Sequence, residues 1–148
     1  MISAVRTILL ADDNAQDVEL TVAALQKNRL ANRIVVVRDG AEALDYLFRR
    51  RTFADRPVDH PGLILLDLKM PKVDGLEVLQ SIKNDPALRM IPVVVLTSSR
   101  EEQDLLRTYD LGANAYVVKP VSFQDFMAAV QALGQFWALI NEVPAAHD

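Results

Sequence analysis

Three aspartates lie where two apolar segments of the chain end. Asp12 and Asp13 follow the apolar segment 7–11, and Asp67 follows the segment 63–66. A strand that is buried on both faces has no solvated side for a charge, so an aspartate is tolerated there only where the strand emerges at the carboxyl edge of the sheet. Open α/β sheets bind their ligands outside that edge. The three carboxylates therefore predict a site rather than an ordinary solvated surface.

Two further reactive side chains follow the next two apolar segments. Thr97 comes after segment 93–96, and Lys119 comes after segment 115–118. Carboxylates that are packed together repel one another and favour a hard divalent cation, and a small set of oxygen ligands favours Mg²⁺. Lys119 supplies a positive charge and Thr97 a hydroxyl donor, which are the groups needed to hold phosphoryl oxygens. Asp67 is the expected nucleophile, which would take a phosphoryl group as an acyl phosphate.

The composition limits the class of protein. With 148 residues, 51% hydrophobic and 24% charged, the chain fits one globular domain. A net charge of −4 gives no reason to approach nucleic acid or an anionic membrane, so protein partners are expected. The absence of cysteine excludes disulfides and thiolate chemistry, and two isolated histidines, His60 and His147, are poorly placed for a metal site or a catalytic triad. No signal peptide and no run of about 18 apolar residues is present, which predicts a cytoplasmic protein.

Short apolar segments alternate with longer amphipathic ones along the chain. Strands are predicted at 7–11, 33–37, 63–66, 93–96 and 115–118, and helices between them. Asn14, Ser99 and Ser122 are predicted helix caps, because each has an acidic residue three positions later. Repeated βα units predict an α/β fold with a five-stranded parallel sheet, doubly wound into three α/β/α layers.

Two segments depart from this compact pattern. Segment 49–62 is longer than the usual connection from helix to strand, and it is either a partner-binding loop or a surface insertion, with its proline and charge content favouring the insertion. Segment 123–142 predicts an extended terminal helix with more apolar residues than one stripe requires. Phe136 and Trp137 in that helix are candidate dimer contacts. One domain is expected over 1–148, with a core at about 6–135 and no output domain.

Four motifs in this order resemble those of a known family. They are Asp12-Asp13 after an apolar segment, the stretch from Asp67 to Gly75, residues 93–98, and residues 116–120. Together they resemble the receiver domain of two-component response regulators, over nearly the whole chain. The resemblance implies a flavodoxin-like fold and a phosphorelay function in which a histidine kinase phosphorylates Asp67. It also implies a phosphoacceptor protein that catalyses only its own phosphotransfer and dephosphorylation.

The resemblance also implies a role for each site residue. Asp12, Asp13 and Asp67 would bind Mg²⁺, or another divalent cation, together with the backbone carbonyl of Lys69. The lysine would add a positive charge beside the site, with an effect on the lifetime of the acyl phosphate.

The resemblance also implies which residues hold the phosphoryl group and which transmit the signal. Thr97 and Lys119 would contact the phosphoryl oxygens. Thr97 and Tyr116 would form the conformational switch, with Thr97 moving towards the phosphoryl group and Tyr116 turning inward.

A narrower resemblance links the chain to stand-alone receivers that pair with bacteriophytochrome histidine kinases. It rests on the long loop before Leu63, on the stretch 100–116 and on the terminal Phe136-Trp137 pair. Relatives in that group often carry Glu-Asp at the position of Asp12-Asp13 and Asn at the position of Lys69. A homodimer is expected, and its predicted contacts are Leu105, Tyr109, Phe136 and Trp137.

Three other functions fit parts of this pattern less well. A haloacid-dehalogenase-like phosphotransferase also uses an aspartate nucleophile with Mg²⁺, but it needs a second aspartate two residues later, where this chain has Lys69. A phosphorylation-independent scaffold with the receiver fold is the remaining alternative, and the full set of acids with Thr97 and Lys119 argues against it. A Rossmann-type nucleotide site is weaker still, because residues 12–16 contain no glycine.

Overall fold

One parallel sheet of five strands forms the centre of the molecule. The computed structural model describes residues 5–27, 31–57, 60–97, 112–113, 115–119, 122, 124–125 and 128. The strands are β1 (Val5–Ala11), β2 (Ala31–Val37), β3 (Leu63–Asp67), β4 (Val93–Thr97) and β5 (Ala115–Val118). Their order across the sheet is β2-β1-β3-β4-β5, and every neighbouring pair is parallel. The predicted strands and the doubly wound α/β fold class are confirmed.

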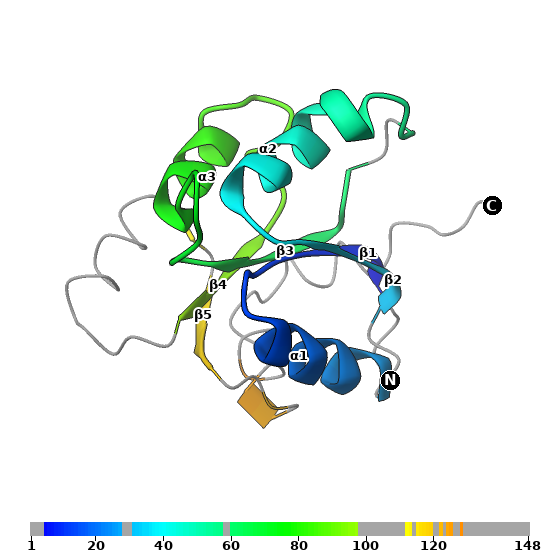
Figure 1. The fold of residues 1–148 in the computed structure, drawn as a ribbon, viewed down its shortest axis with the longest axis vertical. Coiled ribbons are helices and arrows are strands. Elements are labelled where there is room, and N and C mark those ends of the chain that lie inside the picture. Colours follow the sequence, from blue (N-terminus) through cyan, green and yellow to red (C-terminus); the bar gives the residue numbers. More distant parts are fainter. Residues whose placement is uncertain are drawn as a thin grey trace.

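Helices cover both faces of the sheet. α1 (Ala15–Lys27) lies on one face, and α2 (Gly40–Phe48) and α3 (Gly75–Lys83) lie together on the other (Figure 1). Neighbouring residues of one strand therefore enter different cores: Ile8 and Leu10 pack with Leu25 of α1, whereas Leu9 and Ala11 belong to the core under α2 and α3. Because both of their faces are buried, the central strand β3 and residues 93–96 of β4 are continuous apolar runs rather than alternating ones.

Polar side chains fix the start of each described helix. Asn14 Oδ1 accepts a hydrogen bond from the backbone N–H of Asp17 at 2.9 Å, and Ser122 Oγ accepts one from Asp125 at 3.1 Å, which confirms two predicted caps. The third, Ser99, lies outside the described residues. Two aspartates cap the other helices: Asp39 precedes α2 and Asp74 precedes α3. The start of every described helix is therefore fixed at the edge of the sheet where the polar residues gather.

The long connection between α2 and β3 is anchored to the fold. It contains a short 3-10 turn, η1 (Arg51–Phe53), and the Phe53 ring meets the Tyr46 ring edge to face at 5.1 Å. Arg56 donates a hydrogen bond to the Tyr46 carbonyl at 2.7 Å, and its guanidinium stacks 4.2 Å from the centre of the same ring. Arg56 thus adds a second donor to the Tyr46 carbonyl near the end of α2, which also accepts the backbone N–H of Arg49 at 3.3 Å.

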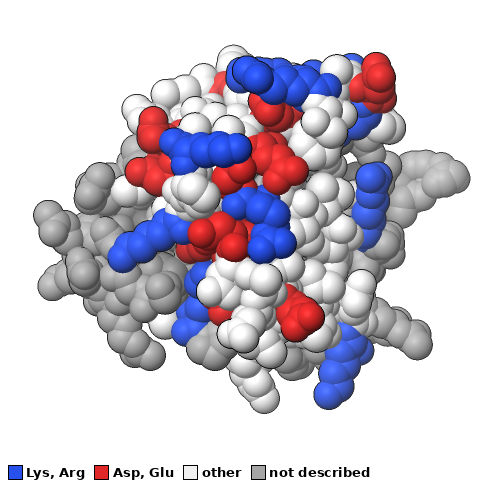
Figure 2. Space-filling view, viewed as in Figure 1, with Lys and Arg blue, Asp and Glu red and all other residues white. Residues whose placement is uncertain are grey.

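Several expectations fall on other parts of the chain. The predicted helix around residues 105–109 and most of the terminal helix 123–142 lie outside the described residues, so the extent of the terminal helix and the domain limits stay predictions. None of the described helices is long and apolar enough to cross a membrane. On the face shown in Figure 2, acidic and basic side chains are interspersed rather than gathered into a patch of one sign.

Candidate functional site

The ends of β1 and β3 bring the predicted acids together. The two strands are neighbours in which Ala11 pairs with Leu66, so the next residues, Asp12 and Asp67, lie side by side at the carboxyl edge. Asp12 is fully buried and Asp67 is 4% exposed, whereas Asp13 is exposed. One carboxylate oxygen from each of the three residues lies within 4.8 Å of the other two. The convergence predicted for these acids is confirmed.

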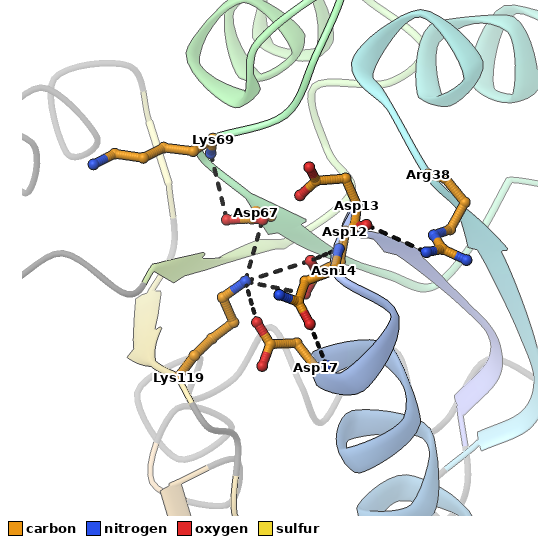
Figure 3. A network of polar contacts seen from close by, with 8 residues as sticks. All are labelled: Asp12, Asp13, Asn14, Asp17, Arg38, Asp67, Lys69 and Lys119. Carbon is orange, nitrogen blue, oxygen red and sulfur yellow. Dashed lines mark hydrogen bonds and ion pairs between the residues drawn. The ribbon is translucent and has the colours of Figure 1, made fainter.

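Lys119 reaches this acidic group from the edge strand β5. It follows β5, and its ammonium lies 3.3 Å from Asp12 Oδ2 and 3.2 Å from Asp67 Oδ2 (Figure 3). A third carboxylate, Asp17 on the first turn of α1, is closer still at 2.9 Å. The Lys119 side chain is only 7% exposed, so these are ion pairs in a largely dehydrated pocket. Such a pocket strengthens each attraction relative to water.

Burial and the neighbouring charges set the ionisation of the pocket. Burial raises the pKa of Asp67 to about 6, helped by the charge of Asp12 and opposed by Lys119. Burial alone would lower the pKa of Lys119, but the hydrogen bond with Asp17 and the charges of Asp67 and Asp12 outweigh it and raise that pKa. Near pH 7 the pocket therefore holds an ionised Asp67 carboxylate beside a Lys119 ammonium.

Backbone donors orient the two buried carboxylates. The N–H of Asn14 donates to Asp12 Oδ1 at 3.0 Å, and the N–H of Lys69 donates to Asp67 Oδ1 at 3.4 Å. Each donor comes from the residue two positions later, so the turn that leaves the strand holds its own acid. The other oxygen of each acid, Oδ2, is the one nearest to Lys119.

Two glycines let the helices on one face pack close to the site. A Cβ on Gly75, the first residue of α3, would lie 2.2 Å from the backbone oxygen of Asp67 and 2.6 Å from Leu68 Cα. A Cβ on Gly40, the first residue of α2, would lie 1.7 Å from the backbone oxygen of Val73. Any side chain at either position would push the backbone that carries Asp67, or the loop after it, out of place.

The donor set fits a divalent metal ion. Asp12, Asp13 and Asp67 offer only carboxylate oxygens, which Mg²⁺ and Mn²⁺ accept as ligands. Arg38 donates a hydrogen bond to the backbone carbonyl of Asp13 at 3.2 Å and so ties the exposed acid to the end of β2. The pocket combines the ligands for a cation with a buried ammonium.

Lys69 lies next to this pocket, but its side chain does not enter it. The side chain is exposed and extends away from the carboxylates (Figure 3). Only its backbone N–H contacts Asp67. The predicted metal ligation by the Lys69 carbonyl stays a prediction.

Of the remaining predicted residues, two lie on described strands and four lie outside the described residues. Thr97 is the last residue of β4 and pairs with Val118 of β5, so its backbone lies at the same edge as the acids. Tyr116 lies on β5 and is 36% exposed. The four predicted dimer contacts lie outside the described residues: Leu105, Tyr109, Phe136 and Trp137.

Asp17 is the site residue that sequence reasoning missed. The sequence indicates Asp17 only as the acid of the capping motif of Asn14. The structure confirms Asn14 as the cap, which accepts the Asp17 backbone N–H, but the Asn14 N–H donates to Asp12 rather than to Asp17. The Asp17 carboxylate makes the shortest contact of Lys119. One signal was available: position 17 is on the first turn of the helix that leaves the acidic edge, so its side chain starts close to the pocket.

Comparison with known proteins places this fold and pocket in one class. Residues 8–131 match the family model of the response regulator receiver domain, and the chain belongs to that family. Receiver domains are signalling proteins that accept a phosphoryl group from histidine kinases and hold a divalent metal ion at an acidic pocket. The alternative of a haloacid-dehalogenase-like phosphotransferase is therefore set aside.

Two solved structures of similar receivers come from bacteriophytochrome systems. The bacteriophytochrome response regulator AtBRR is 61% identical in structure-based comparison, with a TM-score of 0.82, covering 93% of this chain and 98% of its own. The bacteriophytochrome response regulator RtBRR is 56% identical, with a TM-score of 0.83 and coverages of 95% and 84%.

A cyanobacterial relative is similar over the same length. Response regulator Rcp1 of Synechocystis sp. is 38% identical over 141 residues, 95% of each chain. Its Mn²⁺-bound crystal structure has a TM-score of 0.73 and covers 94% of this chain and 96% of that chain. The chain is thus a receiver-domain response regulator similar to phytochrome response regulators.

Proposed function

We propose that Asp67 is the phosphoacceptor of a single-domain response regulator whose phosphoryl donor is a phytochrome-type histidine kinase. The observation that carries this proposal is the surroundings of Asp67. Its carboxylate is buried and ionised near pH 7, it lies 3.2 Å from the Lys119 ammonium, and two further acids are within 4.8 Å. The kinase class is supported by the printed names of AtBRR and RtBRR, which are bacteriophytochrome response regulators.

The transfer needs a nucleophile and a way to balance charge. An oxygen of Asp67 attacks the phosphorus of the kinase phosphohistidine, the N–P bond breaks, and the imidazole nitrogen leaves with the electron pair while the new O–P bond forms an acyl phosphate. Lys119 is close enough to donate a hydrogen bond to the incoming phosphoryl oxygens, and Thr97 lies at the same edge. Water later attacks the phosphorus and returns Asp67 as a carboxylate together with inorganic phosphate.

The metal proposed for this step is Mg²⁺, held by Asp12, Asp13 and Asp67 with the Lys69 carbonyl. The bound ion would neutralise charge on the phosphoryl oxygens during transfer. The all-oxygen donor set supports a hard cation, and the Mn²⁺-bound form of Rcp1 supports divalent binding in a similar protein. The carboxylates of Asp12 and Asp67 are already oriented by backbone N–H groups, which lowers the reorganisation that binding requires.

The signal would be a shift between two conformations. Phosphorylation adds negative charge at Asp67, which favours the conformation in which Thr97 bonds the phosphoryl group and Tyr116 turns inward. The exposed Tyr116 described above fits the unphosphorylated conformation. Dimerisation through Leu105, Tyr109, Phe136 and Trp137 and a cytoplasmic location belong to the same proposal.

Phosphotransfer tests the proposal directly. Labelled phosphoryl groups from a panel of phytochrome-type and other histidine kinases should reach the protein in the presence of Mg²⁺, and Asp67→Asn should remove the label completely. An exposed acid provides the matched control, since Asp55→Asn should be labelled like the wild type. If Asp67→Asn keeps the label, the acceptor is another residue. If no kinase and no small phosphodonor labels the wild type, the scaffold alternative stands.

A further inference from the structure

The three ion pairs of Lys119 differ in length and in the acid they involve. An ammonium group has three N–H donors, and here three carboxylates surround it. Asp12 and Asp67, at 3.3 and 3.2 Å, belong to the acidic trio that fits a metal ion. Asp17, at 2.9 Å, is the closest of the three and does not belong to that trio. Lys119 is therefore shared between the metal-binding acids and one acid outside them.

The position of Asp17 is fixed by the same turn that holds Asp12. The N–H of Asn14 donates to Asp12 Oδ1, and Asn14 Oδ1 in turn accepts the N–H of Asp17 (Figure 3). This hydrogen-bonded sequence joins the end of β1 to the first turn of α1. The Asp17 carboxylate thus has a defined place beside the pocket, with a quarter of the side chain exposed to solvent.

A cation that binds Asp12 and Asp67 would share these two carboxylates with Lys119. The two positive charges repel each other, so the contacts of the ammonium with Asp12 and Asp67 have to lengthen when the cation binds, while the ammonium stays close enough to reach a phosphoryl group on Asp67. An acid on the α1 side of the pocket supplies the attraction that makes this shift possible. Asp17 is the described residue with that placement and contact.

We infer that Asp17 is a positioning residue that draws the Lys119 ammonium to the α1 side of the pocket, so that Asp12 and Asp67 can bind a divalent cation while Lys119 remains within reach of the phosphoryl site. This inference rests on the proposed function of Asp67 and its neighbours. It assigns to Asp17 an effect on metal binding that acts through Lys119 rather than through its own charge.

A double-mutant cycle on Mn²⁺ binding tests the inference. The dissociation constant is measured from the electron paramagnetic resonance signal of free Mn²⁺, without any phosphodonor. Asp17→Asn should raise it about fivefold, because Lys119 then pairs more tightly with the metal-binding acids. In a Lys119→Ala background the same substitution should change it less than about twofold. Asp17→Glu, which keeps a carboxylate, should restore most of the affinity.

A second acid provides the matched control. Glu77 is exposed and occupies the first turn of α3 as Asp17 does in α1, so Glu77→Gln removes an equivalent favourable charge from a helix start. It should leave Mn²⁺ binding unchanged. Circular dichroism melting of Asp17→Asn confirms that the variant is folded at the temperature of the assay.

Two results would overturn the inference. One is wild-type Mn²⁺ affinity in Asp17→Asn; the other is an equal loss of affinity in the wild-type and Lys119→Ala backgrounds, which would mean that Asp17 acts by its own charge. Because the assay needs no phosphorylation, its result is separate from the Asp67→Asn labelling test. A wild-type protein that fails to bind Mn²⁺ at all would contradict the proposed metal site instead.

Discussion

At the scale of single residues, Asp67 combines two conflicting requirements. Under the proposed function its carboxylate has to be dehydrated to meet a phosphoryl group, yet dehydration disfavours the ionised form that would do the chemistry. Lys119 offsets part of the cost, but the pKa of Asp67 still rises to about 6. The ionised acid in the metal-free protein therefore destabilises the fold relative to an unfolded chain, in which the pKa is near 3.8. The site gains reactivity at the expense of stability.

The pH dependence of stability follows from this shift. Between pH 3.8 and about 6 the folded protein binds more protons at Asp67 than the unfolded chain does, so the contribution of Asp67 to stability falls as the pH rises. A shift of about two pKa units corresponds to about 3 kcal/mol. We expect Asp67→Asn to be more stable than the wild type by roughly 1–3 kcal/mol at about pH 7.5, with a smaller difference at about pH 4.5. Urea denaturation in the presence of a chelator measures both values.

The control for this experiment is Asp55→Asn, which removes an exposed acid. Its stability relative to the wild type should not change between the two pH values. A lower stability of Asp67→Asn than of the wild type near neutral pH would contradict the argument, as would a difference that is the same at both pH values.

At the scale of secondary-structure elements, the start of α3 determines where Asp67 lies. Gly75 packs directly on the Asp67 backbone, and its N–H donates to the Leu68 carbonyl at 2.8 Å. The helix is therefore tied to the turn that presents the acid. Its capping residue, Asp74, is the neighbour of this glycine in sequence. Packing of the helix and placement of the Asp67 backbone are thus one structural feature.

A methyl group at position 75 should disturb both the fold and the site. We expect Gly75→Ala to lower the free energy of unfolding by about 1–3 kcal/mol, because its Cβ has no room beside the Asp67 carbonyl. The shifted backbone should also slow the labelling of Asp67 by acetyl phosphate under conditions where the variant is folded. Chemical denaturation and the initial rate of labelling measure the two effects.

Gly112 offers the matched comparison. Its φ is +94°, so Gly112→Ala is also strained, but among the described residues the atoms nearest to its Cβ belong to the flexible side chain of Lys83, at 3.4 Å and beyond. This variant should lose stability without losing the rate of labelling per folded molecule. An equal loss of rate in both variants would show that the effect of Gly75→Ala is not local to Asp67.

Some elements could be predicted from the sequence and others could not, for physical reasons. The central strands were predictable because burial on both faces makes them continuous apolar runs, and the edge strands β2 and β5 because their carboxyl-terminal halves are rich in valine. The meeting of Asp12 with Asp67 was predictable because parallel strands share a carboxyl edge. The contact between Asp17 and Lys119 was not, since it depends on the packing of α1 against the sheet and on the reach of a long side chain. Likewise, nothing local in segment 49–62 indicated that Arg56 would stack on Tyr46.

At the scale of the whole molecule, we expect the signalling output to depend on segment 123–142. The sheet faces are filled by two cores, and charges of both signs are interspersed on the face in Figure 2. The sequence places its surplus aromatic residues in segment 123–142. A homodimer that uses this segment is the arrangement that we expect to carry the response.

The oligomeric state tests that expectation. Sedimentation at micromolar concentration should give a dimer, with and without a phosphoryl mimic such as beryllofluoride, and Trp137→Glu together with Phe136→Glu should give a monomer. Met90→Glu is the matched control, because Met90 is an apolar side chain that is 66% exposed on the described surface. A wild-type protein that sediments only as a monomer in both conditions would rule the dimer out.

The loop between β3 and α3 has a closely packed backbone, but several of its side chains are exposed to solvent. Gly75 and Gly40 bring two helix starts against its ends, Leu68 and Met70 are buried, and Lys69, Pro71 and Lys72 point to solvent. Exposed positions of this kind can be exchanged without repacking a core. Under the proposed function, we therefore expect substitutions at these exposed positions to change the lifetime of the acyl phosphate without moving Asp67.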